Sequence, residues 1–108
     1  MYQIHYLNKI SQQGTALWTE DFALNDDMNA ADGVLVRSAN MHDMELPQNL
    51  LAIARAGAGV NNIPLTSCAD KGIVVFNTPG ANARSVMELT LCGMLLGSRD
   101  IIDGVNWV

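Results

Sequence analysis

Three short apolar runs constrain the fold of this 108-residue sequence more than any other feature. They are GVLVR at 33–37, LLAIARA at 50–56 and IVVF at 73–76. Each run is short, rich in branched side chains and apolar at consecutive positions, as is typical of strands that are covered on both faces. Such strands belong to parallel sheets that helices cover. The sequence therefore predicts an α/β domain.

The segments between these runs alternate in the way such a domain requires. We expect further strands at 2–7 and 22–25 and helices at 11–18, 40–46, 64–72 and 85–99. Ser11 is the expected N-cap of the first helix, and Ser85 with Glu88 forms a capping box for the last. Alternating strands and helices with right-handed crossovers predict a flavodoxin-like, three-layer domain with a five-stranded parallel sheet.

The C-terminal segment differs from the other expected helices. Its apolar side chains point in nearly all directions, whereas a helix that lies on one sheet face keeps a polar stripe. We therefore expect one domain at 1–85 and a connecting helix at 86–108 that packs on something outside this sequence. Self-association of the chain through 86–108 is the expected consequence.

Composition excludes several classes of partner. Six Lys and Arg residues against eleven Asp and Glu residues give a net charge of −5, which argues against nucleic acid or an anionic membrane as the main partner. No window is long and apolar enough to cross a membrane. Cys68 and Cys92 are expected to be buried free thiols in a reducing cytoplasm, and no cluster with metal-ligand spacing is visible.

Cations collect where the expected strands end. Lys9, Arg37 and Arg55 follow or close three strands, and Arg84 follows the last strand after a turn. The carboxyl ends of parallel strands form the edge at which open α/β sheets bind ligands. Guanidinium groups and backbone N–H groups suit carboxylate or phosphate, so we expect a small anionic ligand. The alternative is that Arg37 and Arg55 form ordinary surface ion pairs.

The sequence ARAGAGVNNIP, at 54–64, resembles a dinucleotide-binding loop only in part. The dinucleotide fingerprint requires a third glycine and an acidic residue at the end of the next strand, but Asn62 and Asn77 stand there. We therefore expect the two glycines to let backbone N–H groups approach an anion. A simple tight turn remains the alternative for a lone Gly-x-Gly.

The order of these motifs resembles a known family. VLVRSA at 34–39, LLAIARAGAGVNNIPLTSCADKGIVVFNTPGANARSVMEL at 50–89 and the apolar helix that follows resemble the D-isomer-specific 2-hydroxyacid dehydrogenases. Members have a flavodoxin-like substrate-binding domain, a Rossmann domain that binds NAD and an active site in the cleft between them. The resemblance implies an NAD-dependent oxidoreductase that acts on a 2-hydroxy acid.

The resemblance also implies roles for particular residues. Arg37 and Ser38 are implied to contact a phosphate end of the substrate and Arg55 to reach the same site. The backbone of Ala56–Gly59 is implied to hold the substrate carboxylate, with Ala58 also near the nicotinamide and Asn82 at the cleft. The implied substrate-binding residues are Arg37, Ser38, Arg55, Ala56, Gly57, Ala58, Gly59 and Asn82.

The Rossmann fingerprint and the family's catalytic arginine, glutamate and histidine have no counterpart in these residues. The resemblance therefore implies an N-terminal fragment without the Rossmann domain, which binds substrate but does not turn over alone. The alternative function is that of a stand-alone flavodoxin-like domain for anion binding or signalling. A receiver-type switch fits poorly, because Asn8 and Arg37 stand where it needs acidic residues.

Overall fold

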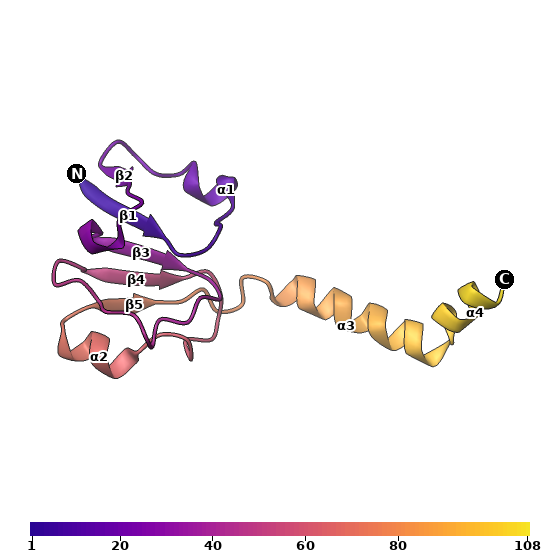
Figure 1. Cartoon of the computed structure of the whole chain (residues 1–108). Coiled ribbons are helices and arrows are strands. Elements are labelled where there is room, and N and C mark those ends of the chain that lie inside the picture. The colour runs from indigo at the N-terminus through magenta and orange to yellow at the C-terminus, as the bar shows by residue number, and fades with distance from the viewer.

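The computed structural model describes residues 1–108 as a twisted sheet from which two C-terminal helices project (Figure 1). All neighbouring strands are parallel, and their order is β2-β1-β3-β4-β5. The predicted α/β class and the five-stranded parallel sheet are thereby confirmed. The strands are β1 Tyr2–Tyr6, β2 Phe22–Leu24, β3 Gly33–Val36, β4 Ala52–Arg55 and β5 Val74–Phe76; the helices are α1 Gln12–Thr15, the 3-10 helix η1 Met28–Ala30, α2 Leu65–Asp70, α3 Ala83–Ser98 and α4 Ile101–Trp107.

One face of the sheet carries the core. The register places Val34 beside Ile53 and Ile53 beside Val75, so these side chains share a face. Helix α2 and the segment between β3 and β4 supply half of the other core side chains. The buried cluster consists of Ala31, Val34, Val36, Met41, Leu46, Leu50, Ile53, Ile63, Cys68 and Ile73.

The opposite face of the sheet remains largely open. Leu24, Val74 and Phe76 lie on it, and each is more than half exposed. Three aromatic rings pack together near β2. The centroid of the Phe22 ring lies 5.0 Å from that of Trp18 and 5.9 Å from that of Tyr2. The chain therefore leaves an apolar sheet surface that its own helices do not cover.

Local signals near two helix ends act as predicted. Ser11 is the N-cap of α1 and its hydroxyl accepts a hydrogen bond from the Gln13 N–H, although α1 ends at Thr15. Gly72 follows the C-cap of α2 with a φ of 72°, a left-handed conformation that glycine adopts without steric cost.

The predicted helix at 40–46 is wrong. The Asn40 side chain accepts a hydrogen bond from the His42 N–H at 2.9 Å, as an N-cap would, but only a single turn follows. Met41, Leu46 and Leu50 are 0%, 4% and 3% exposed. These three side chains anchor an irregular segment into the core, a tertiary contact that the periodicity of the sequence did not reveal.

The predicted capping box is also wrong. Helix α3 begins at Ala83 with Asn82 at the N-cap, so Ser85 already lies inside the first turn. Glu88 instead forms an exposed ion pair with Arg84 at 3.7 Å. The helix leaves the sheet and has α4 as its main tertiary neighbour, with a break at Asp100, whose φ is 49° (Figure 1).

The two cysteines lie in different surroundings. Cys68 is buried as predicted, and desolvation raises the pKa of its thiol while the charge of Lys71 partly lowers it. Cys92 is exposed, so the prediction that it is buried is wrong, because α3 packs on no strand. No helix in the chain has the length and apolar character needed to cross a bilayer.

Replacement of Leu46 by alanine tests the anchoring of the segment between β3 and β4. Since Leu46 is 4% exposed, Leu46→Ala should lower the free energy of unfolding by about 2–5 kcal/mol in urea titrations. The matched control is Leu17→Ala, which removes a side chain that is 81% exposed and should change it by less than about 0.5 kcal/mol. Equal effects of the two variants would contradict this packing.

Candidate anion-binding site

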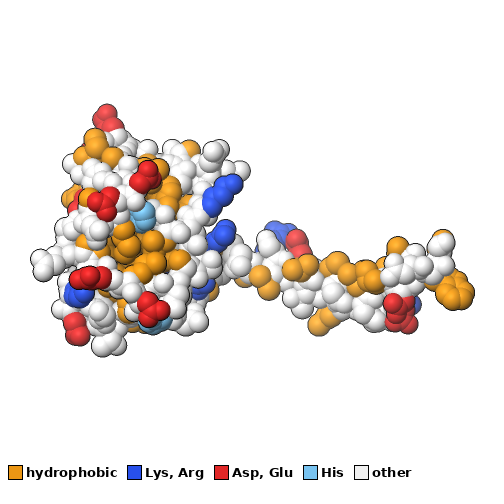
Figure 2. Space-filling model, viewed as in Figure 1, with side chains coloured by type: hydrophobic (Ala, Val, Ile, Leu, Met, Phe, Trp, Pro, Cys, Tyr) orange, Lys and Arg blue, Asp and Glu red, His pale blue; other side chains and the backbone are white.

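The carboxyl ends of the strands meet at the edge from which α3 departs. The arrowheads of β1, β3 and β4 point to this edge in Figure 1, and Figure 2 shows Lys and Arg side chains along it. Lys9 follows β1, Arg37 follows β3 and Arg55 closes β4. The expected gathering of cations at one edge of an acidic protein is thus observed.

The Arg37–Ala39 turn, which follows β3, has all its N–H groups engaged by one side chain. The Oδ1 of Asn8 accepts from the N–H groups of Arg37, Ser38 and Ala39 at 2.7, 3.1 and 3.1 Å. These three donors are therefore not available to a ligand. The exposed side chains of Arg37 and Ser38 are what the turn offers to the solvent.

Two carbonyl groups of the same turn, those of Arg37 and Ala39, accept hydrogen bonds from side chains after β3. The Arg55 Nε donates to the Arg37 carbonyl at 2.9 Å, and the Asn62 Nδ2 donates to the Ala39 carbonyl at 2.8 Å and more weakly to that of Arg37 at 3.4 Å. The buried Oδ1 of Asn62 has no hydrogen-bond partner within the chain. Asn8, Asn62 and Arg55 together determine the conformation of the turn.

The Gly57–Gly59 loop, which follows β4, has its carbonyl groups engaged instead. The Thr78 N–H and hydroxyl donate to the Gly57 carbonyl at 3.0 and 3.3 Å, and the Asn77 Nδ2 donates to that of Ala58 at 2.9 Å. The Arg55 Nη1 donates to the Gly59 carbonyl. Donors from β4 and from the segment after β5 thus bind every carbonyl of the loop.

The N–H groups of this loop show the opposite pattern. The Ala56 N–H still donates to the Val36 carbonyl at 2.8 Å, as part of the sheet ladder, but those of Gly57, Ala58 and Gly59 have no acceptor within the chain. Ala58 and Gly59 are exposed and Gly57 is partly buried. Three consecutive donors are therefore free at the edge where the cations gather, an arrangement suited to an anion.

The two glycines of the loop make room for Arg55. A Cβ at Gly57 would lie 3.2 Å from the Cζ of Arg55, and one at Gly59 would lie 3.0 Å from its Nη1. Neither glycine has a positive φ, so the constraint is steric rather than conformational. Since the guanidinium uses its Nε and Nη1 on backbone carbonyls, Arg55 organises the site more than it reaches a ligand.

Asn82 lies beside the loop. A surface cavity of about 310 Å³ is lined by Ala56, Gly57, Thr78, Ala81 and Asn82. The Asn82 side chain makes no capping hydrogen bond to α3, so its amide is available to the cavity. The structure brings the residues that sequence motifs single out onto one edge of the sheet.

Sequence reasoning missed the hydrogen bonds by which Asn8, Asn62, Asn77 and Thr78 hold the backbone of the candidate site. Their roles depend on which backbone groups they meet across the sheet edge, between 19 and 31 residues away in sequence. Their position in the sequence was the available signal: Asn77 directly follows β5 and Asn8 comes two residues after β1, at the edge where ligands bind in such sheets.

The residues present do not form a dinucleotide site. The glycines of the loop pack on Arg55, the segment after them is a turn rather than the start of a long helix, and the Asn77 amide is bonded to the Ala58 carbonyl. An NAD site requires a helix N-terminus for the pyrophosphate and an acidic residue for the ribose. Ala58, the one cofactor contact that the resemblance implies, is exposed at this edge.

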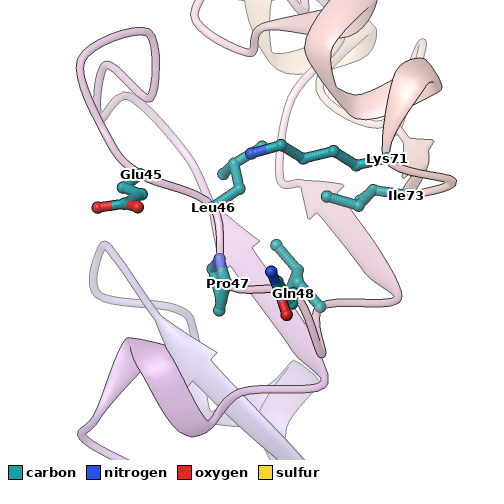
Figure 3. Close-up of a pocket in the computed structure, with 7 residues that line it drawn as sticks. Glu45, Leu46, Pro47, Gln48, Lys71 and Ile73 are labelled. Atoms are coloured by element: carbon teal, nitrogen blue, oxygen red, sulfur yellow. The ribbon is translucent and has the colours of Figure 1, made fainter.

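A second depression lies at the other end of the strands. It has a volume of about 320 Å³ and lies where β4 and β5 begin, since Leu50 and Ile73 line it (Figure 3). Figure 3 shows Lys71 reaching from the end of α2 toward the segment that carries Leu46. Glu45 also lines it but forms no ion pair with Lys71. We place the anion site at the carboxyl edge, where free donors and cations coincide.

Comparison with known proteins identifies the family. Residues 2–103 match the D-isomer specific 2-hydroxyacid dehydrogenase family, catalytic domain. The chain belongs to this family. A hydroxypyruvate reductase of Thermotoga maritima is 40% identical over 98 residues, which are 88% of this chain and 32% of that protein. The D-3-phosphoglycerate dehydrogenase of Methanocaldococcus jannaschii is 35% identical over 101 residues, 91% of this chain and 19% of that protein.

Solved structures agree with this assignment. The NAD+-bound 3-phosphoglycerate dehydrogenase of Entamoeba histolytica superposes with a TM-score of 0.72 at 28% identity, covering 89% of this chain and 39% of that one. An NADPH-dependent glyoxylate/hydroxypyruvate reductase of Sinorhizobium meliloti has the same fold, with a TM-score of 0.82 at 22% identity over 99% of this chain and 38% of that one. The chain spans about a third or less of the curated relatives named above.

A double-mutant cycle tests whether the absence of a side chain at Gly59 makes room for the Arg55 guanidinium. Gly59→Ala should lower the free energy of unfolding by about 1 kcal/mol, because the added methyl group displaces the guanidinium from its hydrogen bonds. In an Arg55→Ala background the same substitution should cost close to nothing, which gives a coupling energy of about 1 kcal/mol. Chemical denaturation of the four proteins measures it.

Gly14→Ala is the control for this cycle, because a Cβ at Gly14 meets no atom within 4 Å. Its effect should be the same with and without Arg55. Additive effects of Gly59→Ala and Arg55→Ala would show that the loop glycine has no steric role toward the guanidinium.

Proposed function

We propose that this chain is the substrate-binding part of an NAD-dependent D-3-phosphoglycerate dehydrogenase, which oxidises 3-phosphoglycerate to 3-phosphohydroxypyruvate for serine biosynthesis. One observation carries the proposal: the free N–H groups of Gly57, Ala58 and Gly59 lie at the same sheet edge as the exposed side chains of Arg37 and Ser38. Two donor groups of different kind match a substrate with two anionic ends.

Each donor group suits one end of such a substrate. Backbone N–H groups suit the planar carboxylate, next to the carbon that carries the hydroxyl group. The Arg37 guanidinium with the Ser38 hydroxyl suits the phosphate, since arginine binds phosphate oxygens in pairs. The Asn82 amide, in the adjoining cavity, supplies a further polar contact near the substrate. These groups bind and orient the substrate.

The cofactor belongs to the same proposal. We propose that NAD is bound mainly by residues outside these 108, with Ala58 near the nicotinamide, because the residues present lack a pyrophosphate cradle and a ribose-binding acid. The NAD+-bound relative from Entamoeba histolytica, of which the chain covers 39%, supports this division. The 108 residues alone should then bind 3-phosphoglycerate without oxidising it. The free thiols of Cys68 and Cys92 accord with a cytoplasmic location.

Hydroxypyruvate is a second candidate substrate, because the hydroxypyruvate reductase of Thermotoga maritima matches 88% of the chain at 40% identity. Hydroxypyruvate is the keto acid of glycerate, as 3-phosphohydroxypyruvate is of 3-phosphoglycerate, so the two substrate pairs differ in the phosphate group. The phosphate is therefore the group whose recognition must be measured. A stand-alone signalling domain needs neither substrate.

Arg37→Ala provides that measurement. In the 108-residue chain, 3-phosphoglycerate should shift the Gly57, Ala58 and Gly59 amide resonances. Arg37→Ala should weaken the binding of 3-phosphoglycerate by tenfold or more, because a charge-assisted hydrogen bond worth about 1.5–3 kcal/mol of binding free energy is lost. Binding of glycerate, which lacks the phosphate, should change by less than about twofold. The control is Arg99→Ala, which removes an exposed cation at the end of α3.

An unchanged spectrum of the three amides at millimolar 3-phosphoglycerate would contradict the proposed function. Equal losses of 3-phosphoglycerate and glycerate binding in Arg37→Ala would favour a substrate without phosphate, as hydroxypyruvate is. These two results separate a wrong site from a wrong substrate.

We also propose that two copies of the chain associate through residues 86–108. The solvent-accessible surface is 7924 Å², whereas a compact monomer of this mass exposes about 5,900 Å². The radius of gyration is 19.0 Å against about 13 Å for a compact domain of this length. The difference in area is as large as a stable interface, and much of it comes from α3 and α4, where Leu89, Met94 and Val105 are 74%, 64% and 68% exposed.

Met94→Glu tests this association. Sedimentation equilibrium under reducing conditions should show a dimer for the wild-type chain at tens of micromolar and a monomer for Met94→Glu, because a carboxylate cannot be buried unpaired in an apolar interface. Leu17→Glu, at a side chain that is 81% exposed outside α3 and α4, should remain dimeric. A wild-type chain that stays monomeric at high concentration would contradict the proposal.

A further inference from the structure

Asn8 holds a position whose chemistry the proposed function does not use. Its single side-chain oxygen receives the N–H groups of Arg37, Ser38 and Ala39, from 29 to 31 residues away. Three converging N–H groups form a ready anion site. In this chain a neutral amide oxygen of the protein occupies that site, so the turn next to the cationic edge keeps no free backbone donor.

The two loops of the edge therefore divide their donors differently. The Gly57–Gly59 loop has engaged carbonyls and free N–H groups, whereas the Arg37–Ala39 turn has both kinds of backbone group engaged. Only side chains of the turn remain to meet a ligand. Asn8 thereby fixes the direction in which the Cα–Cβ bonds of Arg37 and Ser38 leave the backbone.

The choice of asparagine has an electrostatic consequence. Aspartate has the same shape and accepts hydrogen bonds from N–H groups more strongly, so it would hold the turn at least as well. It would also place a negative charge beside Arg37. That charge would repel an anionic ligand at this edge, and the repulsion would act within the Debye length. An amide holds the turn without this opposing charge.

We propose that Asn8 is a positioning residue that sets the affinity of this edge for phosphorylated anions: it orders the Arg37–Ala39 turn and keeps the local charge positive. The inference rests on the proposed function, because it concerns the same anion site. It adds a residue that contacts no ligand and acts through Arg37 and Ser38.

The test compares Asn8→Asp with Asn8→Ala in the 108-residue chain, using 3-phosphoglycerate and inorganic phosphate as probes. Asn8→Asp should keep the slow hydrogen exchange of the Arg37, Ser38 and Ala39 amides and the melting temperature, but weaken 3-phosphoglycerate binding about threefold to fivefold at low salt. That deficit should shrink toward zero at 0.5 M salt, because it is electrostatic.

Asn8→Ala should behave differently. The three amides should exchange faster, and binding should be weak at low and at high salt alike, because the turn is no longer ordered. Asn29→Asp is the charge-matched control, because Asn29 lies in η1 and its side chain makes no hydrogen bond. The affinity of this variant for 3-phosphoglycerate should stay within twofold of wild type. A merely structural role for Asn8 predicts no salt-dependent deficit in Asn8→Asp.

Several results would overturn the proposal. These are wild-type affinity in Asn8→Asp at low salt, tighter phosphate binding in Asn8→Ala, or equal amide exchange in wild type and Asn8→Ala. The proposed function fails separately, if the wild-type chain binds neither probe. The exchange of the three amides then still decides whether Asn8 orders the turn.

Discussion

The hydrogen bonds of one guanidinium group connect the ends of β3 and β4, and the geometry of the anion site depends on them. Arg55 donates from Nε to the Arg37 carbonyl and from Nη1 to the Gly59 carbonyl. The rigid planar fork of arginine makes these two bonds from one group, which lysine could not do. The glycines at 57 and 59 are the steric condition for this arrangement, because any Cβ there would meet the guanidinium.

The edge as a whole is built from complementary use of backbone groups. Asn8, Asn62, Asn77 and Thr78 satisfy N–H or C=O groups of the two loops from elements that the parallel order brings together. Buried or constrained backbone groups need such partners, since an unsatisfied one is costly. The N–H groups of Gly57–Gly59 have no acceptor within the chain and are therefore available to a ligand.

Sequence patterns predicted the strands well and two of the helical features poorly. The runs at 33–37, 50–56 and 73–76 became β3, β4 and β5, because strands of a parallel sheet carry their signal in their own composition. The segment at 40–46 has the predicted hydrogen bond of Asn40 but no helix, because Met41 and Leu46 are buried in the core from an irregular segment. The helix expected from Ser85 started earlier, and Cys92 lies exposed on it. The errors at 40–46 and at Cys92 share a cause: burial depends on neighbours that are distant in sequence.

By itself the sequence determined the α/β class, the parallel sheet, the family and the gathering of cations at the carboxyl edge. These follow from composition within short runs and from motif order, both of which are local. Only the tertiary structure decided what those residues do: Arg55 binds backbone rather than facing a ligand, Asn8 occupies the donors of the Arg37–Ala39 turn, and the loop N–H groups stay free. The physical reason is that a donor is available only if nothing else in the folded chain has accepted from it, and that depends on contacts between strands far apart in sequence.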